Sequence, residues 1–226
     1  MNKFEHLYPN DYFKDRSSND RYRIKSFLSE RDFLLKHINF KGSVCDVGCS
    51  TGEFLNSIGW LGEKYGMEIS EFAIEIAKKN NIDFSKNIET EKSFFDLVIF
   101  RGTIQHVPTP FEYISKAYES LKPGGMIVFI ATPNSNSLVY KLTNTLPVLY
   151  PELNFYIPSD ITLINACQNF GFEFLELRKP YLKSPYSNFL LDHIKFLIMV
   201  IFKKKPNFPF WGNMMDLILR KPEAKQ

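Results

Sequence analysis

Two acids and a glycine-rich turn have the residue types and the spacing that could bind a nucleotide. Residues 44–47 are apolar except for Asp46, and a turn of small residues follows directly at 48–52. This pattern predicts a buried strand, a tight turn and a helix beginning at Glu53, whose free backbone N–H groups would face a ligand. The second acid, Glu68, ends the next short strand-like segment. An acid about 20 residues beyond the first strand is how open α/β sheets hold the ribose hydroxyls of an adenosine.

Three kinds of site could use this turn, and the spacing separates them. A dinucleotide site needs Gly-x-Gly-x-x-Gly, whereas this chain has Gly48, Ser50 and Gly52 in alternation, so the glycine that approaches the pyrophosphate is out of register. The same residues match the Gly-x-Ser-x-Gly elbow of the α/β-hydrolases, with Asp96 and His106 following in the required order. That elbow normally follows several strands, and no His-Gly-Gly segment precedes it here. The third kind is a cofactor turn of the form Asp-x-Gly-x-Gly-x-Gly.

The turn and four later signals resemble the class I S-adenosylmethionine-dependent methyltransferases, and among them the ubiquinone and menaquinone type. Residues 95–100 are similar to the fourth strand of that family, and residues 105–108 (Gln-His-Val-Pro) to the Glu-His-Val-Pro that often follows it. Residues 121–125 (Leu-Lys-Pro-Gly-Gly) resemble its turn into strand five, and residues 132–134 resemble the end of that strand. All five signals occur in the order that the family has.

The resemblance implies S-adenosylmethionine as cofactor and S-adenosylhomocysteine as product. It places the methionine part over the turn, the ribose on Glu68, the adenine near the loop after the third strand and the methyl group near the end of the fourth. Asp46 could also anchor the turn by accepting backbone N–H bonds, and the two roles are compatible. The residues that the resemblance assigns to the cofactor are Asp46, Gly48, Cys49, Ser50, Gly52, Glu68, Ile69, Asn87, Ile88, Phe100, Arg101 and Gly102.

Ser50 is the clearest departure from the family, which usually has a glycine at that position. A Cβ narrows the approach of the methionine part, and its cost depends on whether the backbone there needs a positive φ. We expect cofactor binding to survive with modestly altered affinity, because the hydroxyl can replace a water molecule.

A catalytic base is needed only if the acceptor is a hydroxyl group that must lose its proton. His106 is the best placed candidate. The alternative is that it caps or packs the turn before Val107. Some quinone-methylating relatives carry two glutamates near this histidine that are thought to hold a metal, but the matching residues here are Gly102 and Gln105. Since neither can ionise, we expect no metal site.

The composition is that of one cytoplasmic enzyme domain. A chain of 226 residues can form a single α/β core with a cap but is short for two full domains. The net charge is +3 and no basic stripe alternates with aromatic residues, so nucleic acid is not expected as substrate. The N-terminus lacks the apolar core of a signal peptide, and three cysteines without a second metal-binding pair fit a reducing compartment.

Strand-like and helix-like segments alternate around the site. They predict a doubly wound, mostly parallel α/β sheet, which the resemblance makes seven-stranded and Rossmann-like with the last strand antiparallel, under a helical cap. We expect helices at 70–79, 110–121 and 158–169, a short strand near 82–84, and strands at 172–177 and 212–221. The expected divisions of this single domain are N-terminal cap helices at 1–40, the cofactor-binding half at 41–134, a substrate-side insertion at 135–157 and the C-terminal half of the core at 158–221.

Residues 189–202 are the most apolar stretch, and three lysines follow at 203–205. The stretch is too short to span a bilayer, which takes about 20 residues. Either it is buried within the chain or against a second copy in a homodimer, or it lies in a membrane surface with the lysines on anionic head groups. We favour the first alternative, while the second would make the protein membrane-peripheral.

The expected function is methyl transfer to a small molecule, most simply to oxygen. The acceptor would lie between the N-terminal helices and the 135–157 insertion, whose aromatic residues either line a pocket or pack on the core. We favour a sugar or surface-glycan precursor as acceptor, and the alternative is a quinone or other lipid-like phenol. A protein of another class, a non-catalytic cofactor-binding or scaffold protein, would keep the same turn. The insertion's aromatic residues are Tyr140, Tyr150, Phe155 and Tyr156.

Overall fold

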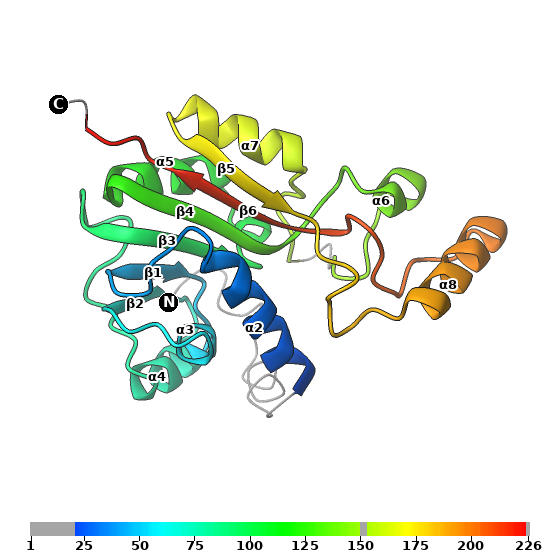
Figure 1. Cartoon of the computed structure of the whole chain (residues 1–226), viewed down its shortest axis with the longest axis horizontal. Coiled ribbons are helices and arrows are strands. Elements are labelled where there is room, and N and C mark those ends of the chain that lie inside the picture. The colour runs from blue at the N-terminus through cyan, green and yellow to red at the C-terminus, as the bar shows by residue number, and fades with distance from the viewer. Residues whose placement is uncertain (1–20, 150–152, 225–226) are drawn as a thin grey trace.

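The computed structural model describes residues 21–149 and 153–224, which form a six-stranded sheet covered by helices on both faces (Figure 1). The strand order is β2-β1-β3-β4-β6-β5; β1 to β4 are parallel, and β6 runs antiparallel between β4 and β5. This confirms the predicted doubly wound sheet and its antiparallel last strand. The strands are β1 (Val44–Val47), β2 (Lys64–Met67), β3 (Phe95–Arg101), β4 (Leu121–Pro133), β5 (Glu173–Arg178) and β6 (Met214–Arg220).

The strand predicted near 82–84 would bring the sheet to seven strands. It is reduced to one parallel bridge between Asp83 and Tyr65 of β2. Both carboxylate oxygens of Asp83 accept hydrogen bonds from Ser85, at 2.7 Å from its backbone nitrogen and 2.9 Å from its hydroxyl. Such a local turn bends the backbone away from the sheet edge immediately after the bridge. The extended pairing therefore ends after a single residue.

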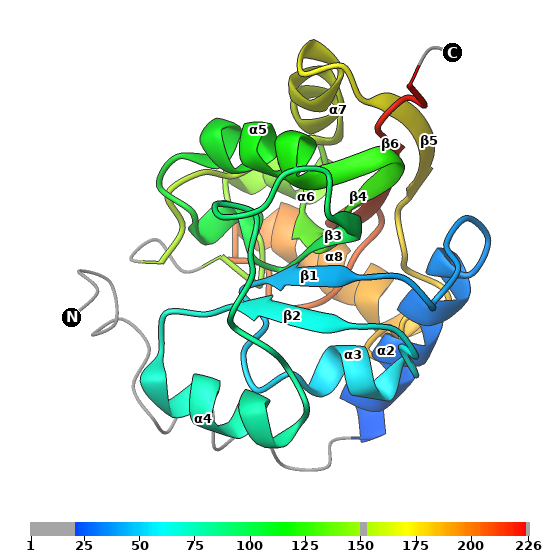
Figure 2. The same ribbon diagram turned by 90° about the vertical axis from the view of Figure 1, so that its left-hand side faces the viewer.

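Helices α2 (Arg21–Leu34), α3 (Glu53–Ser57) and α4 (Glu71–Lys79) cover one face of the sheet, and α5 (Pro110–Ser120) and α7 (Asp160–Asn169) cover the other (Figures 1 and 2). Leu97 and Ile99 of β3 pack toward the first set of helices, and Val98 and Phe100 toward the second. Burial on both faces explains why the parallel strands are continuous apolar runs rather than alternating ones.

The helix ends follow the predicted signals closely. The Ser70 side chain accepts a hydrogen bond from the Ala73 backbone, and Ser159 forms a capping box with Thr162 at the start of α7. The end of α5 is different, because Leu121 already pairs with Phe95 as the first residue of β4. The helix therefore stops one residue earlier than predicted, and the Pro-Gly-Gly segment belongs to the strand.

A small lobe lies beyond one end of the sheet and contains α6 (Leu138–Thr143) and α8 (Phe189–Phe202) (Figure 1). The bounds predicted for the apolar segment are those of α8, but its expected burial within the chain is wrong. One side of the helix contacts the lobe and the rest is exposed. Among the described residues, no helix is both long enough and apolar enough to cross a membrane. The lobe has its own apolar cluster, made of Val139, Leu146, Met199, Phe208 and Phe210.

Candidate cofactor and acceptor site

The turn after β1 has a left-handed backbone at three alternate positions. Gly48, Ser50 and Gly52 have φ angles of 77°, 51° and 74°. A Cβ on Gly48 would lie 2.5 Å from Thr103, and one on Gly52 would lie 2.5 Å from Ile82, so both positions require glycine. Ser50 adopts the same conformation with a Cβ, at a cost of about 1–2 kcal/mol. The backbone at Ser50 therefore does have the positive φ that makes a serine costly at this position.

Glu68 follows β2 and is held by backbone N–H groups. Its carboxylate accepts hydrogen bonds from the backbone nitrogens of Ser50 at 3.0 Å, Ile69 at 2.8 Å and Ser70 at 3.1 Å. A carboxylate just before the first turn of α4 also interacts favourably with the helix dipole. Two of these bonds use Oε1 and only one uses Oε2, so Oε2 keeps a lone pair that a ribose hydroxyl can use.

Asp46 is almost fully buried beneath the same turn. Its Oδ1 has no hydrogen-bond partner among the described residues. Burial raises the pKa of Asp46 to about 7, although the nearby Arg101 guanidinium acts in the opposite direction. A buried carboxyl with an unsatisfied oxygen is suited to a cationic ligand group such as the ammonium of S-adenosylmethionine. The residues present therefore fit the cofactor that the resemblance implied.

Arg101, at the end of β3, is fixed by a residue far away in the sequence. Its guanidinium forms a bidentate ion pair with Glu30 of α2, with Nε–Oε2 and Nη2–Oε1 distances of 2.7 and 3.0 Å. It also lies over the rings of Phe27 and Phe54, at 4.5 and 5.1 Å from their centroids. The pair ties α2 to the carboxyl end of the sheet. No sequence motif links residues 30 and 101, so no local pattern could have indicated Glu30.

The remaining residues assigned to the cofactor occupy varied environments. Gly102 has a φ of 61°, and Cys49 is buried in the turn. The ring of Phe100 stacks on Phe129 in the core with centroids 5.3 Å apart, and the side chain of Ile88 is buried in the same cluster. These two could reach the cofactor only through their backbones. The Asn87 side chain accepts a bond from the Glu89 backbone at 2.8 Å.

His106 lies in a short 3-10 helix, η2 (Ile104–His106), and connects two segments. Its Nδ1 is 2.7 Å from the carbonyl oxygen of Leu153, and its Nε2 is 3.2 Å from the amide nitrogen of Gln105. Since a carbonyl can only accept, we assign the proton to Nδ1, and Nε2 then accepts from Gln105. These contacts favour the structural role over that of a base. Across residues 21–149 and 153–224 no group of three or more His, Cys, Asp or Glu is placed to hold a metal ion.

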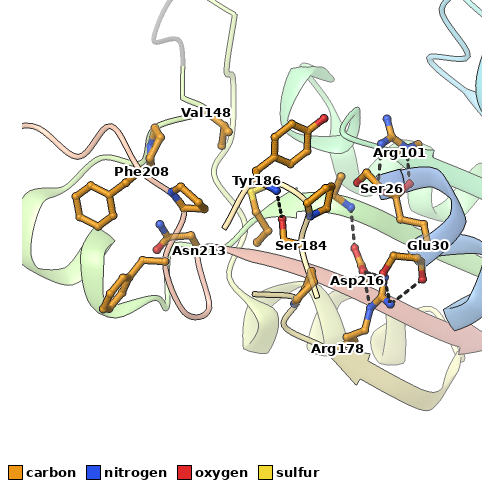
Figure 3. A pocket seen from close by; sticks show the side chains of 18 of the residues that line it. Ser26, Glu30, Arg101, Val148, Arg178, Ser184, Tyr186, Phe208, Asn213 and Asp216 are labelled. Atoms are coloured by element: carbon orange, nitrogen blue, oxygen red, sulfur yellow. Dashed lines mark hydrogen bonds and ion pairs between the residues drawn. The ribbon is translucent and has the colours of Figure 1, made fainter. Parts of the chain in front are cut away.

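A cavity of about 320 Å³ adjoins Arg101 (Figure 3). It is formed by α2, by the ends of β3, β4, β5 and β6, by Pro147 and Val148 of the insertion, and by the loops at 180–186 and 207–213. Figure 3 shows charged side chains gathered at one end and Val148 and Phe208 toward the other. The cavity lies between α2 and the insertion, where the acceptor site is predicted, and two later loops that the sequence did not indicate complete it.

The charged end of the cavity contains two neutral ion pairs. One is the pair of Glu30 with Arg101. In the other, Arg178 binds Asp216 through Nε at 2.9 Å and Nη2 at 2.6 Å. Burial raises the pKa of Asp216, while Arg178 opposes the shift. The other oxygen of Asp216 accepts the backbone N–H of Ala131 at 2.9 Å. Both carboxylates are thus fixed where an acceptor hydroxyl could donate to them.

The described aromatic residues of the insertion, for which lining and packing were both open, lie outside the cavity. Tyr140 packs against the cluster of the small lobe, and the hydroxyl of Tyr156 is 3.0 Å from that of Thr162. Neither these two nor Phe155 lines the cavity. Tyr150 lies outside the described residues. Of the described residues of the insertion, Pro147 and Val148 line the cavity, so the pocket alternative is wrong for Tyr140, Phe155 and Tyr156.

Comparison with known proteins identifies relatives of this chain. Residues 19–177 match the family described as methyltransferase domain. A demethylmenaquinone methyltransferase of Oceanobacillus iheyensis is 26% identical over 156 residues, covering 62% of this chain and 66% of the relative. A ubiquinone biosynthesis O-methyltransferase of Shewanella is 30% identical over 109 residues, or 43% and 46% of the two chains. The chain thus spans between 46% and 66% of the length of these relatives.

A solved structure has the same fold over nearly the whole chain. It is described as a SAM-dependent methyltransferase, possible histamine N-methyltransferase, of Thermotoga maritima, with a TM-score of 0.65 and 21% identity. The alignment covers 96% of this chain and 99% of that one. At this identity the likeness shows a shared fold.

Proposed function

The chain belongs to the methyltransferase domain family, whose cofactor is S-adenosylmethionine, and on this premise we propose that it methylates a small lipid-like phenol of the quinone type. The curated relatives described above are named for menaquinone and ubiquinone. They support the alternative of the sequence analysis and give no support to its preferred acceptor, a sugar or glycan precursor. Because the chain spans only part of the length of those relatives, their acceptors do not by themselves identify the acceptor of this chain.

The shape and chemistry of the cavity carry this proposal. Its charged end offers hydrogen-bond acceptors to one or two hydroxyl groups, and its other end is lined by Val148 and Phe208, with Asn213 beside them. A phenolic head group with an apolar tail matches both ends. A sugar would place hydroxyl groups against Val148 and Phe208, which return none of the hydrogen bonds to water that those groups lose. The amide of Asn213 at this end could bind one of them, but not a whole ring of hydroxyl groups.

The cofactor supplies an electrophilic methyl group when bound, so alignment of the acceptor is the main task of the protein. Asp46 would hold the ammonium group and Glu68 the ribose. Glu30 accepts the hydrogen bond and then the proton of the phenol, and Arg101 stabilises the negative charge that develops on its oxygen. The apolar wall excludes water from the line of attack.

Calorimetric titration with S-adenosylhomocysteine tests the cofactor site, with NAD as control ligand and Glu68→Ala beside the wild type. We expect binding of S-adenosylhomocysteine alone, lost in the variant because the ribose loses its acceptor. Absence of binding to the wild type would contradict the cofactor site and favour the scaffold alternative.

Transfer of a labelled methyl group tests the acceptor. Three acceptors are compared: a prenylated catechol, the same head group without its tail, and a nucleotide-activated sugar. We expect label on the prenylated catechol first. Label on the sugar alone, or no transfer by a protein that binds the cofactor, would overturn the proposal.

Glu30→Gln tests the assigned proton acceptor. An amide keeps a hydrogen bond to Arg101 but cannot take a proton, so we expect kcat to fall by roughly 100-fold with little change in cofactor affinity. Glu173→Gln is the matched control, since Glu173 pairs with Arg220 at 2.8 Å on the surface. Equal activity of the two variants would remove Glu30 from the mechanism.

A further inference from the structure

The outward surface of α8 has the opposite character to that of an ordinary surface helix. The side chains that contact the lobe include a buried aspartate, whereas those that face away from it are almost all apolar. Exposed side chains range from 39% for Ile198 to 71% for Leu190. The exposed apolar residues of α8 are Phe189, Leu190, Leu191, Ile194, Leu197, Ile198, Val200, Ile201 and Phe202.

The lobe holds α8 firmly through its inner side. The buried Asp192 accepts hydrogen bonds from the Tyr181 hydroxyl at 3.0 Å and from the Asn188 backbone at 2.8 Å. Phe196 stacks on Phe210 with centroids 4.4 Å apart, and Met199 is buried in the apolar cluster of the lobe. The outward side chains are therefore presented by a fixed helix and do not take part in holding it in place.

The width of the apolar surface indicates what covers it. At about 100° per residue, the exposed apolar side chains of α8 span roughly 220° of its circumference. A packed helix typically buries a stripe of roughly 100°, so one partner helix would leave much of this surface in water. A fluid hydrocarbon layer can cover the full arc at once.

The charges at the end of α8 match the same partner. Lys203, Lys204 and Lys205 follow the helix directly and are all exposed. Trp211, which is 41% exposed, lies on the loop that returns from the helix. Basic residues beside an apolar helix bind anionic head groups, and tryptophan favours the boundary between head groups and acyl chains.

We propose that α8 and Lys203–Lys205 dock on the surface of an anionic lipid bilayer, with the helix lying in the boundary between head groups and acyl chains. Both loops that flank α8 line the cavity, one through Tyr186 and the other through Phe208. The docked helix would place the apolar end of the cavity near the lipid. That an acceptor with an apolar tail enters from the bilayer rests on the proposed function; the docking does not.

Sedimentation of the full chain with vesicles tests the docking. Vesicles of phosphatidylcholine alone are compared with vesicles that also contain phosphatidylglycerol, at low and at high salt. We expect binding to the anionic vesicles, weakened by salt. The triple variant K203E/K204E/K205E should bind them more than tenfold more weakly, because each change reverses a charge at the lipid surface. The matched control is K78E/K79E/K92E, which reverses three exposed lysines outside the lobe and should bind like the wild type.

A second variant, L190S/L197S/I201S, tests the apolar surface without touching the inner side of α8. We expect it to lose vesicle binding and to keep wild-type transfer to a tail-less acceptor in solution. Wild-type protein that stays in the supernatant with anionic vesicles would overturn the docking. So would a wild-type dimer in light scattering that becomes monomeric in this variant, since the surface would then join two copies. Failure of methyl transfer in solution, with vesicle binding intact, would count against the proposed function alone.

Discussion

At the residue scale, Asp46 shows how a buried acid suited to a charged ligand lowers the folding stability of the ligand-free protein. Its folded pKa of about 7 is above the ordinary value of 3.8. The folded chain therefore holds a proton that the unfolded chain has lost between about pH 4 and pH 7, so stability falls as the pH rises through that window. Above it the buried carboxylate is ionised, and Arg101 compensates it only in part.

Asp46→Asn should therefore stabilise the free protein and weaken cofactor binding. We expect its melting temperature to exceed that of the wild type by a few degrees at pH 8, with a smaller difference at pH 5. Affinity for S-adenosylhomocysteine should fall by roughly 10- to 100-fold, the cost of losing a charged hydrogen bond. Thermal unfolding and calorimetry at both pH values measure these effects. A lower melting temperature at pH 8 would instead show that Asp46 anchors the turn.

Ser50 raises a different question at the same scale, because its backbone is strained while its hydroxyl has no partner among the described residues. Ser50→Gly relieves the strain, so we expect equal or slightly higher thermal stability and less than roughly tenfold change in cofactor affinity. Ser50→Ala keeps the strain and lacks the hydroxyl, which separates the two effects. Tightening by more than tenfold in the glycine variant would show that the site does not tolerate serine well.

At the scale of elements, the site depends on segments held against the sheet by a few long-range contacts. The Glu30 pair with Arg101 holds α2, and the His106 bond to Leu153 holds the end of the insertion. Strands buried on both faces cannot easily move, so the adjustable parts of the site are these attached segments. Loosening either one should affect the acceptor more than the cofactor.

A pair of variants separates the two roles considered for His106. Asn can place a donor where Nδ1 lies but cannot act as a base, so His106→Asn should keep near wild-type kcat and the same pH profile. His106→Ala loses the donor to Leu153, and its KM for the acceptor should rise. Steady-state kinetics across pH measures both. A fall in kcat of roughly 100-fold in the Asn variant, with loss of one ionisation, would establish catalysis by His106.

At the scale of the whole molecule, the cofactor turn and the proposed acceptor cavity belong to different parts of the structure, the central sheet and the small lobe. The turns after β1 and β2 belong to the twisted sheet, whose two faces are each covered by an apolar cluster. The cavity proposed for the acceptor is completed by the small lobe, which has the third cluster. The lobe can therefore change its lining or its surface without altering the cofactor turn.

Phe210→Ala tests this separation. Phe210 is buried in the lobe cluster and stacks on Phe196, so its removal should destabilise the lobe by roughly 3–5 kcal/mol. We expect a higher KM for the acceptor and unchanged affinity for S-adenosylhomocysteine. Phe100→Ala is the control, because it opens the core beneath the sheet edge and should weaken cofactor binding as well. Loss of cofactor affinity in the first variant would show that the two bodies fold as one unit.

Short-range features of this protein could be predicted from its sequence because they depend on neighbours along the chain. The glycine turn, the caps at Ser70 and Ser159 and the bounds of α8 follow from local backbone and hydrogen-bond requirements. The antiparallel direction of the last strand followed from the family resemblance. The strand predicted near 82–84 is only a single bridge at Asp83. A three-residue strand and a single bridge have the same sequence pattern, and the turn that follows decides between them.

Tertiary structure alone decided which distant residues meet and which apolar surfaces remain uncovered. The pairs formed by Glu30 with Arg101 and by Arg178 with Asp216 join segments with no common periodicity, so no local pattern could indicate them. The sequence of α8 has the same hydrophobicity whether it is buried or exposed. Burial depends on whether other elements have surface left to cover it, and here the lobe covers only one side. For that reason the sequence determined the cofactor turn, whereas folding in three dimensions determined the cavity proposed for the acceptor and the exposed face of α8.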